Sequence, residues 1–311
     1  MPRRPLQRIQ AITVARRYFL ERHTKSRIAE DLAISRFKVA RLIDEAIEEG
    51  LVRFEIDDAG ELDARLSDRL REKYSLRSAL VLAGPDLPCS ALIEPLGRVA
   101  ASLLEEMLTD GCVLGVAWGR TLAATANAIT RLPKVNVVQV AGGLAALEFP
   151  QNSTDLVYRM ASAGHGTAYP VFLPMWVEDP SLVERLRTEP AVAQVLDWYD
   201  RIDVLVTGIG SWNPPVSCLH NTFSETWRKQ VLADGVRADV CATLIDDAGQ
   251  VVRSPLDQVG LAINAKQLRR IPEIIGIAGG LEKANAILAA LRGNWITTLV
   301  TDAGVAHRLL E

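Results

Sequence analysis

From Ser78 to the last residue, short apolar runs alternate with amphipathic stretches, and this alternation constrains the fold more than any other feature. The expected strands are Ala79–Leu82, Val113–Ala117, Val135–Val140, Val204–Thr207, Val240–Ile245, Glu273–Ile277 and Ile296–Thr301. The expected helices between them are Ala91–Leu108, Thr121–Arg131, Thr226–Ala233, Lys283–Leu291 and Ala303–Leu310. Nearly continuous β-branched runs are typical of parallel strands covered on both faces by their connecting helices. We therefore predict an α/β fold with a doubly wound, largely parallel sheet.

The first part of the chain has a helical pattern instead. Three helices are expected, over Leu6–Glu21, Lys25–Leu32 and Ser35 to about Glu49, and then a short strand over Leu51–Ile56. Ile12, Ala15 and Phe19 have the spacing of one helix face, and Thr24 and Ser35 are candidate N-caps. The pattern predicts a winged-helix-like domain at 1–57 and an α/β domain at 58–311, with a linker helix within 58–77.

Charge is divided between these two parts. The whole chain of 311 residues has a net charge of −3, but residues 1–43 hold eleven basic and three acidic side chains. The N-terminal part is therefore strongly positive and the rest is acidic, which indicates an anionic partner for the N-terminal part alone. A solvated basic helix face is the alternative interpretation.

The three-helix pattern resembles the helix-turn-helix of bacterial regulators, with Ala29, Val39 and Leu42 at its helix contacts. A recognition helix beginning at Ser35 would place Arg36, Lys38 and Arg41 in the major groove of double-stranded operator DNA. Phe37 is expected either to touch a thymine methyl group or to be a partly covered core aromatic. Arg16, Arg17, Lys25 and Arg27 are expected to neutralise phosphates. A helical module that binds protein is the alternative, and Ala33, where many such turns have glycine, leaves the turn geometry open.

Glycine-rich turns follow several expected strands. They are 115–121 (GVAWGRT), 141–143 (AGG), 207–211 (TGIGS) and 276–280 (GIAGG). In an open α/β sheet, ligands bind beyond the carboxyl ends of the strands, and helix N-termini there favour anions. Although steric needs alone favour glycine in such turns, their number beside Arg120, Thr121 and Lys283 predicts a phosphate site. The P-loop and the GxGxxG motif are absent, so ATP and NAD are not expected.

Nearly the whole chain is similar to the SorC family of sugar-responsive bacterial regulators. The similar stretches are 35–42 (SRFKVARL), 115–121 (GVAWGRT), 239–241 (DVC), 246–249 (DDAG), 256–257 (LD), 277–283 (IAGGLEK) and 286–302 (AILAALRGNWITTLVTD). The resemblance implies a fold shared with ribose-phosphate isomerases and glucosamine-phosphate deaminases. It also implies a phosphorylated sugar or polyol as effector and a homo-oligomer, usually a tetramer.

The resemblance and the glycine-rich turns together give a set of candidate effector-binding residues. Gly119, Arg120 and Thr121 would hold the phosphate and Lys283 would supply the counter-charge. Carboxylates accept hydrogen bonds from hydroxyls, so Asp246 and Asp257 would bind the sugar. The remaining candidates are Asn152, Asp155, Gly142, Gly143, Gly208 and Gly280. For each acid, turn capping or a surface carboxylate is the alternative.

A departure from the family bears on the ligand. Ala242-Thr243 stands where many members have Gly-Arg, which favours a monophosphate or an unphosphorylated polyol.

Other sites are not expected. The four histidines are scattered and the four cysteines form no CxxC pair, so no metal and no cofactor is predicted. No segment is typical of a membrane span or signal peptide, which predicts a cytoplasmic location.

The sequence therefore predicts a DNA-binding regulator of carbohydrate or polyol genes and no catalytic residues. The alternatives are a sugar-phosphate isomerase or deaminase-like enzyme, and a sugar-binding protein whose N-terminal part contacts protein.

Overall fold

The computed structural model describes residues 5–52, 61–144 and 153–311. They belong to two compact units, Met1–Asp57 and Asp58–Glu311. Each unit has its own apolar core.

The N-terminal unit is built from the helices α1 (Pro5–Phe19), α2 (Lys25–Asp31) and α3 (Arg36–Glu48). Both predicted N-caps are present: the hydroxyls of Thr24 and Ser35 accept hydrogen bonds from the backbone N–H groups of Arg27 (3.3 Å) and Lys38 (3.1 Å). Its core contains Ala11, Val14, Ile28, Ala29, Val39, Leu42 and Ile43.

The structure of this unit differs from the expected one in two places. Of the predicted face of α1, Ala15 is buried and Phe19 packs on the core, whereas Ile12 is 45% exposed and Ala11 and Val14 complete the inner face. Within the predicted strand, Leu51 and Val52 form a bend. Its remaining residues, 53–56, lie outside the described residues.

The C-terminal unit contains a seven-stranded sheet in which every strand pairing is parallel. Its strands in spatial order are β1 (Ser78–Leu82), β10 (Thr298–Asp302), β9 (Glu273–Ile277), β5 (Val204–Gly208), β2 (Val113–Val116), β3 (Asn136–Gln139) and β4 (Thr167–Tyr169). Every residue of β2, β9 and β10 is buried, which confirms that both faces are covered.

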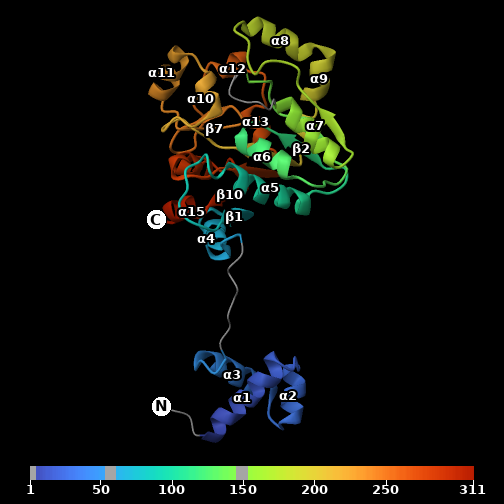
Figure 1. The fold of residues 1–311 in the computed structure, drawn as a ribbon, viewed down its shortest axis with the longest axis vertical. Helices are drawn as coiled ribbons and strands as arrows, with labels where there is room; N and C mark the ends of the chain where they lie inside the picture. The colour runs from blue at the N-terminus through green and yellow to red at the C-terminus, as the bar shows by residue number, and fades with distance from the viewer. Residues whose placement is uncertain (1–4, 53–60, 145–152) are drawn as a thin grey trace. The chain divides into compact units, whose positions relative to one another are not determined.

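The helices of this unit are α4 (Ala64–Tyr74), α5 (Ile93–Met107), α6 (Arg120–Ala128), α7 (Ser153–Ala163), α8 (Pro180–Thr188), α9 (Pro190–Leu196), α10 (Cys218–Thr222), α11 (Glu225–Ala233), α12 (Leu256–Val259), α13 (Ala265–Leu268), α14 (Ala284–Arg292) and α15 (Ala303–Leu310), with single 3₁₀ turns at η1 (Tyr199–Arg201) and η2 (Leu281–Lys283). Figure 1 shows α5, α6 and α7 gathered together over the sheet. The chain moves in one direction from β2 through α6 to β3, and in the opposite direction from β9 through α14 to β10. Because such crossovers are right-handed, α6 and α14 cover opposite faces, as in a doubly wound fold.

The predicted linker helix, α4, packs onto the C-terminal unit. Leu66 and Leu70 on α4 lie in the core of that unit. Lys73 Nζ and Tyr74 Oη both donate hydrogen bonds to the carbonyl oxygen of Leu309 on α15, each at 2.7 Å.

One predicted strand was wrong. Val240–Ile245 is divided between β7 (Ala238–Val240) and β8 (Thr243–Ile245), an antiparallel hairpin that joins β6 (Gly210–Ser211) in a separate sheet. The turn consists of Cys241 and Ala242, both with positive φ (47° and 63°). Two successive left-handed residues are the backbone of a tight hairpin turn, but they have no glycine or asparagine to mark it in the sequence.

Candidate functional site

The N-terminal half of α3 presents basic side chains and one aromatic ring to solvent. Arg36, Lys38 and Arg41 are exposed, and Arg41 also lies 3.5 Å from the carboxylate of Glu45. Phe37 is 88% exposed, which excludes the interpretation as a partly covered core aromatic. Ser35, as N-cap, fixes the first turn of this surface.

The other basic candidates of the N-terminal unit have differing surroundings. Arg16 is exposed and lies 3.4 Å from Glu21, and Arg27 is exposed in the first turn of α2. Lys25 is half-buried, with its ammonium 5.6 Å from the centre of the Tyr18 ring. Arg17 forms an ion pair with Asp31 at 3.2 Å that ties α1 to α2. Arg16 and Arg27 are therefore the more accessible cations.

In the C-terminal unit, a pocket lies where the strand order changes direction. The chain leaves β2 toward β3 on one side and leaves β5 toward β9 on the other, so the carboxyl ends of β2 and β5 flank a topological switch point. A pocket with about 560 Å³ of empty space opens there. Its lining includes Cys89, Trp118, Gly119, Arg120, Thr121, Thr207, Gly208, Ser217, Cys218, Asp239, Cys241 and Lys283. We call it the switch-point pocket.

The amino end of α6 forms one wall of this pocket. Gly119 is the N-cap, with φ of 138°, and a Cβ built there would meet no atom within 4 Å. Gly119 offers no side-chain cap to α6, and of its first N–H groups that of Arg120 is bonded to the Cys218 thiol. Free amides at the positive end of a helix form a ready anion site.

Lys283 enters the same pocket from the turn before α14. Its Nζ donates a hydrogen bond to the carbonyl oxygen of Ile209 at 2.9 Å. Gly280 does not line the pocket, but its φ of 90° and the hydrogen bond from its N–H to Asp302 Oδ1 (2.7 Å) set the start of this turn. Gly280 therefore positions Lys283.

The carboxyl group of Asp239 is buried beside Lys283. Its Oδ1 accepts hydrogen bonds from Ser217 Oγ (2.5 Å) and Trp212 Nε1 (2.8 Å). Burial raises the pKa of Asp239, while Ser217, Trp212 and the ammonium of Lys283 oppose that rise. The pocket thus places a carboxyl group and an ammonium group close enough to influence each other.

The thiol of Cys218 lies within the electrostatic influence of both pocket cations, Lys283 and Arg120. Burial raises the pKa of its thiol, and Lys283 and Arg120 are the next largest influences, both lowering that pKa. The backbone N–H of Arg120 also bonds to this thiol. Two cations and a helix N-terminus therefore converge around Cys218.

Several candidate residues are not brought to this pocket. Asp246 Oδ1 accepts hydrogen bonds from the N–H groups of Ala248 (2.9 Å) and Gln250 (2.8 Å), which is a turn-stabilising role. Asp155 forms an ion pair with Arg159 at 2.8 Å on α7. Gly142 and Gly143 make backbone hydrogen bonds to Leu261 and Leu173. Asn152 lies outside the described residues.

Asp257 lies at a second, more open pocket with about 990 Å³ of empty space. Asp257 Oδ2 accepts a hydrogen bond from the N–H of Ser254 at 3.0 Å. Ala242 and Thr243 also line this pocket, whereas Asp239 and Cys241 line the switch-point pocket. The turn between β7 and β8 therefore separates the two.

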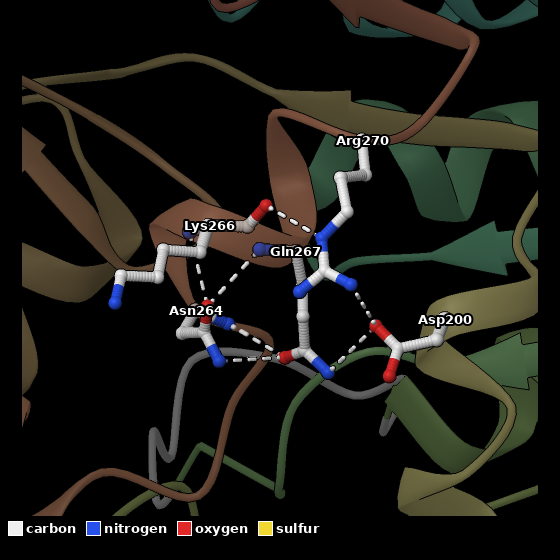
Figure 2. Close-up of polar contacts among 5 residues, drawn as sticks. All are labelled: Asp200, Asn264, Lys266, Gln267 and Arg270. Carbon is white, nitrogen blue, oxygen red and sulfur yellow. Dashed lines mark hydrogen bonds and ion pairs between the residues drawn. The ribbon is translucent and has the colours of Figure 1, made fainter.

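Figure 2 shows how the α13 side of this second pocket is held. Asn264 Oδ1 accepts hydrogen bonds from the N–H groups of Lys266 and Gln267, both at 3.0 Å, and Gln267 Oε1 accepts one from Asn264 Nδ2 at 2.8 Å. Asp200 Oδ1 forms an ion pair with Arg270 Nη1 and accepts a hydrogen bond from Gln267 Nε2, each at 3.4 Å. These polar groups bind one another, so they fix α13 in place and are not arranged around a ligand.

Asp239, Ser217 and Thr207 also line the pocket and were not among the residues expected there from the sequence. Asp239 belongs to a stretch that resembles the family, but the acids expected at the site were Asp155, Asp246 and Asp257. The signal was the run Asp239-Val240-Cys241 itself, because an acid inside an apolar run must be paired or functional.

Two further findings concern other classes of site. Within residues 5–52, 61–144 and 153–311, no group of three or more histidine, cysteine or acidic side chains has the arrangement of a metal site. Among the helices of that same part of the chain, none has the length and apolar character to cross a membrane.

Comparisons with known proteins give one consistent result. The model of a sugar-binding domain family matches residues 60–311. The sorbitol operon regulator of Klebsiella pneumoniae is 27% identical over 310 residues, which cover 96% of this chain and 97% of that protein. The deoxyribonucleoside regulator of Bacillus subtilis (strain 168) is 26% identical over 304 residues, 97% of each chain.

Solved structures agree. The crystal structure of the full-length sorbitol operon regulator SorC from Klebsiella pneumoniae superimposes with a TM-score of 0.76 at 25% identity. The match covers 99% of this chain and all of that one (100%). The similarity therefore includes both units.

Proposed function

The chain belongs to the SorC family of sugar-binding transcriptional regulators, and from this premise we propose that it controls carbohydrate or polyol genes. In this proposal the N-terminal unit binds operator DNA, and a phosphorylated sugar or polyol binds in the switch-point pocket. The observation that carries the effector part is the convergence of the α6 N-terminus, Lys283 and Asp239 in one pocket.

The phosphate group is assigned to the α6 end of the pocket. The backbone amide of Thr121, in the first turn of α6, would donate to a phosphate oxygen. Lys283 and Arg120 supply positive charge at the same point. Amides and cations together favour a phosphate over a neutral group.

The hydroxyl groups are assigned to Asp239 and Ser217. An ionised carboxylate only accepts hydrogen bonds, so it suits a polyol, which offers many donors. Asp239 lines the pocket and its Oδ1 is already held by Ser217 and Trp212, which fixes the orientation of the carboxyl group. This assignment replaces Asp246, Asp257 and Asp155 as the residues that bind the sugar.

A thermal-shift screen against sugar phosphates, polyol phosphates and their unphosphorylated parents tests the effector assignment. A phosphorylated ligand at about 100 times its Kd adds about 2.7 kcal/mol of stability and raises the Tm. Lys283→Met is expected to lose this shift. Lys266→Met is the matched control, because it removes the same charge from the second pocket and should keep the shift. A shift that survives in Lys283→Met would contradict the phosphate site.

DNA binding by the N-terminal unit is tested by the salt dependence of binding. If Arg16, Arg27 and Lys38 neutralise phosphates, log K for duplex DNA falls linearly with log salt, and removing one cation lowers the slope by about 1. If this unit binds a protein instead of DNA, removing one of these cations should leave the slope of log K for DNA against log salt unchanged.

The enzyme alternative is tested by turnover. An isomerase needs a base and an acid that move a proton on the substrate, and Asp239 and Lys283 are the pair available in the switch-point pocket. The relatives named above are regulators, which favours a binding role for this pair. We expect no isomerisation of pentose or hexose phosphates by the purified protein. A rate that disappears in Asp239→Asn would support the enzyme.

We also propose that the protein acts as a homo-oligomer, with the tetramer as the expected state. Light scattering coupled to size exclusion tests this directly, because each chain contributes 34.0 kDa.

A further inference from the structure

Phe37 has the greatest exposed fraction, 88%, of the large apolar side chains that the structure describes as exposed. It is the second residue of α3 and lies between two exposed cations, Arg36 and Lys38. A single exposed apolar side chain is ordinary on a protein surface, and what sets Phe37 apart is its position between these two cations.

The geometry of α3 directs Phe37 away from the core. Val39, Leu42 and Ile43 are buried, and they define the inner face of the helix. At about 100° per residue, Phe37 lies almost opposite the middle of that face, with Arg41 one turn further along the outer face. The residue that points most directly outward at the start of α3 is therefore an aromatic ring.

The charges along α3 indicate which partner meets this ring. The first six residues of the helix hold Arg36, Lys38 and Arg41 and no acid, whereas its second half and C-cap hold Asp44, Glu45, Glu48 and Glu49. A polyanion is attracted to the first half and repelled by the second. The ring is thus surrounded by the part of the helix that DNA approaches.

We propose that Phe37 contacts the 5-methyl group of a thymine in the major groove and makes the operator half-site depend on that thymine. The inference rests on the proposed operator binding. The N-terminal residues of a recognition helix meet base edges, and the thymine methyl is the apolar group that the major groove offers to a phenyl ring. Arg36, Lys38 and Arg41 bind phosphates or guanine around it.

The test replaces thymine by deoxyuridine, which pairs identically and lacks only the methyl group. Full-length protein first selects its preferred duplexes from a random-sequence library. Each thymine of the selected duplex is then replaced singly. We expect one position in each half-site at which the replacement weakens binding about four-fold, the change for one buried carbon group. The same replacement should not weaken binding by Phe37→Ala.

Two controls separate this contact from general weakening. Arg41→Gln removes an exposed neighbour on the same helix face, so it should bind more weakly and keep the four-fold sensitivity to the methyl group. Phe37→Ala should melt at the wild-type temperature, because Phe37 is not part of the core cluster of its unit.

The outcomes distinguish this inference from the function on which it rests. A selected duplex without any methyl-sensitive position would overturn the role of Phe37 alone, as would equal sensitivity in wild type and Phe37→Ala. Failure of the wild-type protein to enrich any sequence would overturn operator binding, and this inference with it.

Discussion

At the scale of single residues, Asp239 shows how the pocket combines binding with a cost in stability. Its carboxyl group is buried, and burial raises its pKa above the ordinary value of 3.8. A carboxyl group whose pKa is higher in the folded protein stabilises it fully below the ordinary pKa, and this contribution is lost as the pH rises through the folded value. Above its folded pKa, the ionised Asp239 therefore lowers the free energy of unfolding.

Asp239→Asn is expected to lose effector binding and to gain stability. The neutral amide avoids the burial penalty, so this variant should melt a few degrees higher than wild type at pH 8. The difference should shrink as the pH falls through the folded pKa of Asp239, where the wild-type carboxyl group becomes neutral like the amide. Melting curves across that pH range test this prediction, and the thermal response to sugar phosphates should be lost.

Asp257→Asn provides the comparison for that experiment. Asp257 is exposed and lies at the second pocket, so its variant should keep the thermal response to sugar phosphates. An Asp239→Asn protein that melts below wild type at every pH would contradict the argument, since its loss of hydrogen bonds would then exceed the relief of burial.

At the scale of elements, the turn between α2 and α3 holds a non-glycine residue in a left-handed conformation. Ala33 has φ of 50° at the end of α2. This conformation costs an L-residue about 1–2 kcal/mol, while glycine adopts it freely at an entropic cost of about 0.5–1 kcal/mol. Ala33→Gly should therefore stabilise the N-terminal unit by about 0.5–1 kcal/mol.

Hydrogen exchange of the α2 and α3 amides in the full-length protein measures this change without separating the units. Exchange should slow in Ala33→Gly. Ala40→Gly, in the interior of α3, should have the opposite sign and cost about 1 kcal/mol. Faster exchange in Ala33→Gly would show that the turn is held by contacts that glycine weakens.

Elements with strong periodicity could be predicted from the sequence, and the residues between them could not. The helices around Thr24 and Ser35 and six of the seven parallel strands were expected close to their observed positions, because caps and β-branched runs mark them locally. The hairpin at 238–245 was missed because its turn, Cys241-Ala242, has no glycine.

The same error bears on the expected position of Asp246. A parallel strand ending at Ile245 would bring Asp246 to the carboxyl edge of the sheet. In the antiparallel hairpin the chain reverses at Cys241, so Asp239 and Cys241 line the switch-point pocket and Asp246 returns to stabilise the next turn. Gly119, Arg120, Thr121, Gly208 and Lys283 were placed correctly beside one another because each follows or lies near the end of a strand that is parallel.

At the scale of the whole molecule, charge separates the two roles along the chain. The first 43 residues are strongly positive and the remainder is acidic. An acidic C-terminal unit repels DNA, so the proposed operator contacts belong to the N-terminal unit, while Lys283 and Arg120 place positive charge at the switch-point pocket, where the proposed effector phosphate would bind. Communication between the two ligands must therefore pass through the protein.

This separation leads to a quantitative prediction about linkage. If a sugar phosphate changes the affinity for operator by some factor, operator must change the affinity for that sugar phosphate by the same factor, which for allosteric proteins is typically about 5–150. Titrating the ligand from the thermal-shift screen with and without the selected duplex, and the duplex with and without the ligand, measures both. The Lys283→Met variant should bind the selected duplex with the same affinity in the presence and in the absence of the ligand. A factor of one in the wild-type protein would mean that the pocket binds its ligand equally in both states, and a ligand of that kind shifts no equilibrium however tightly it binds.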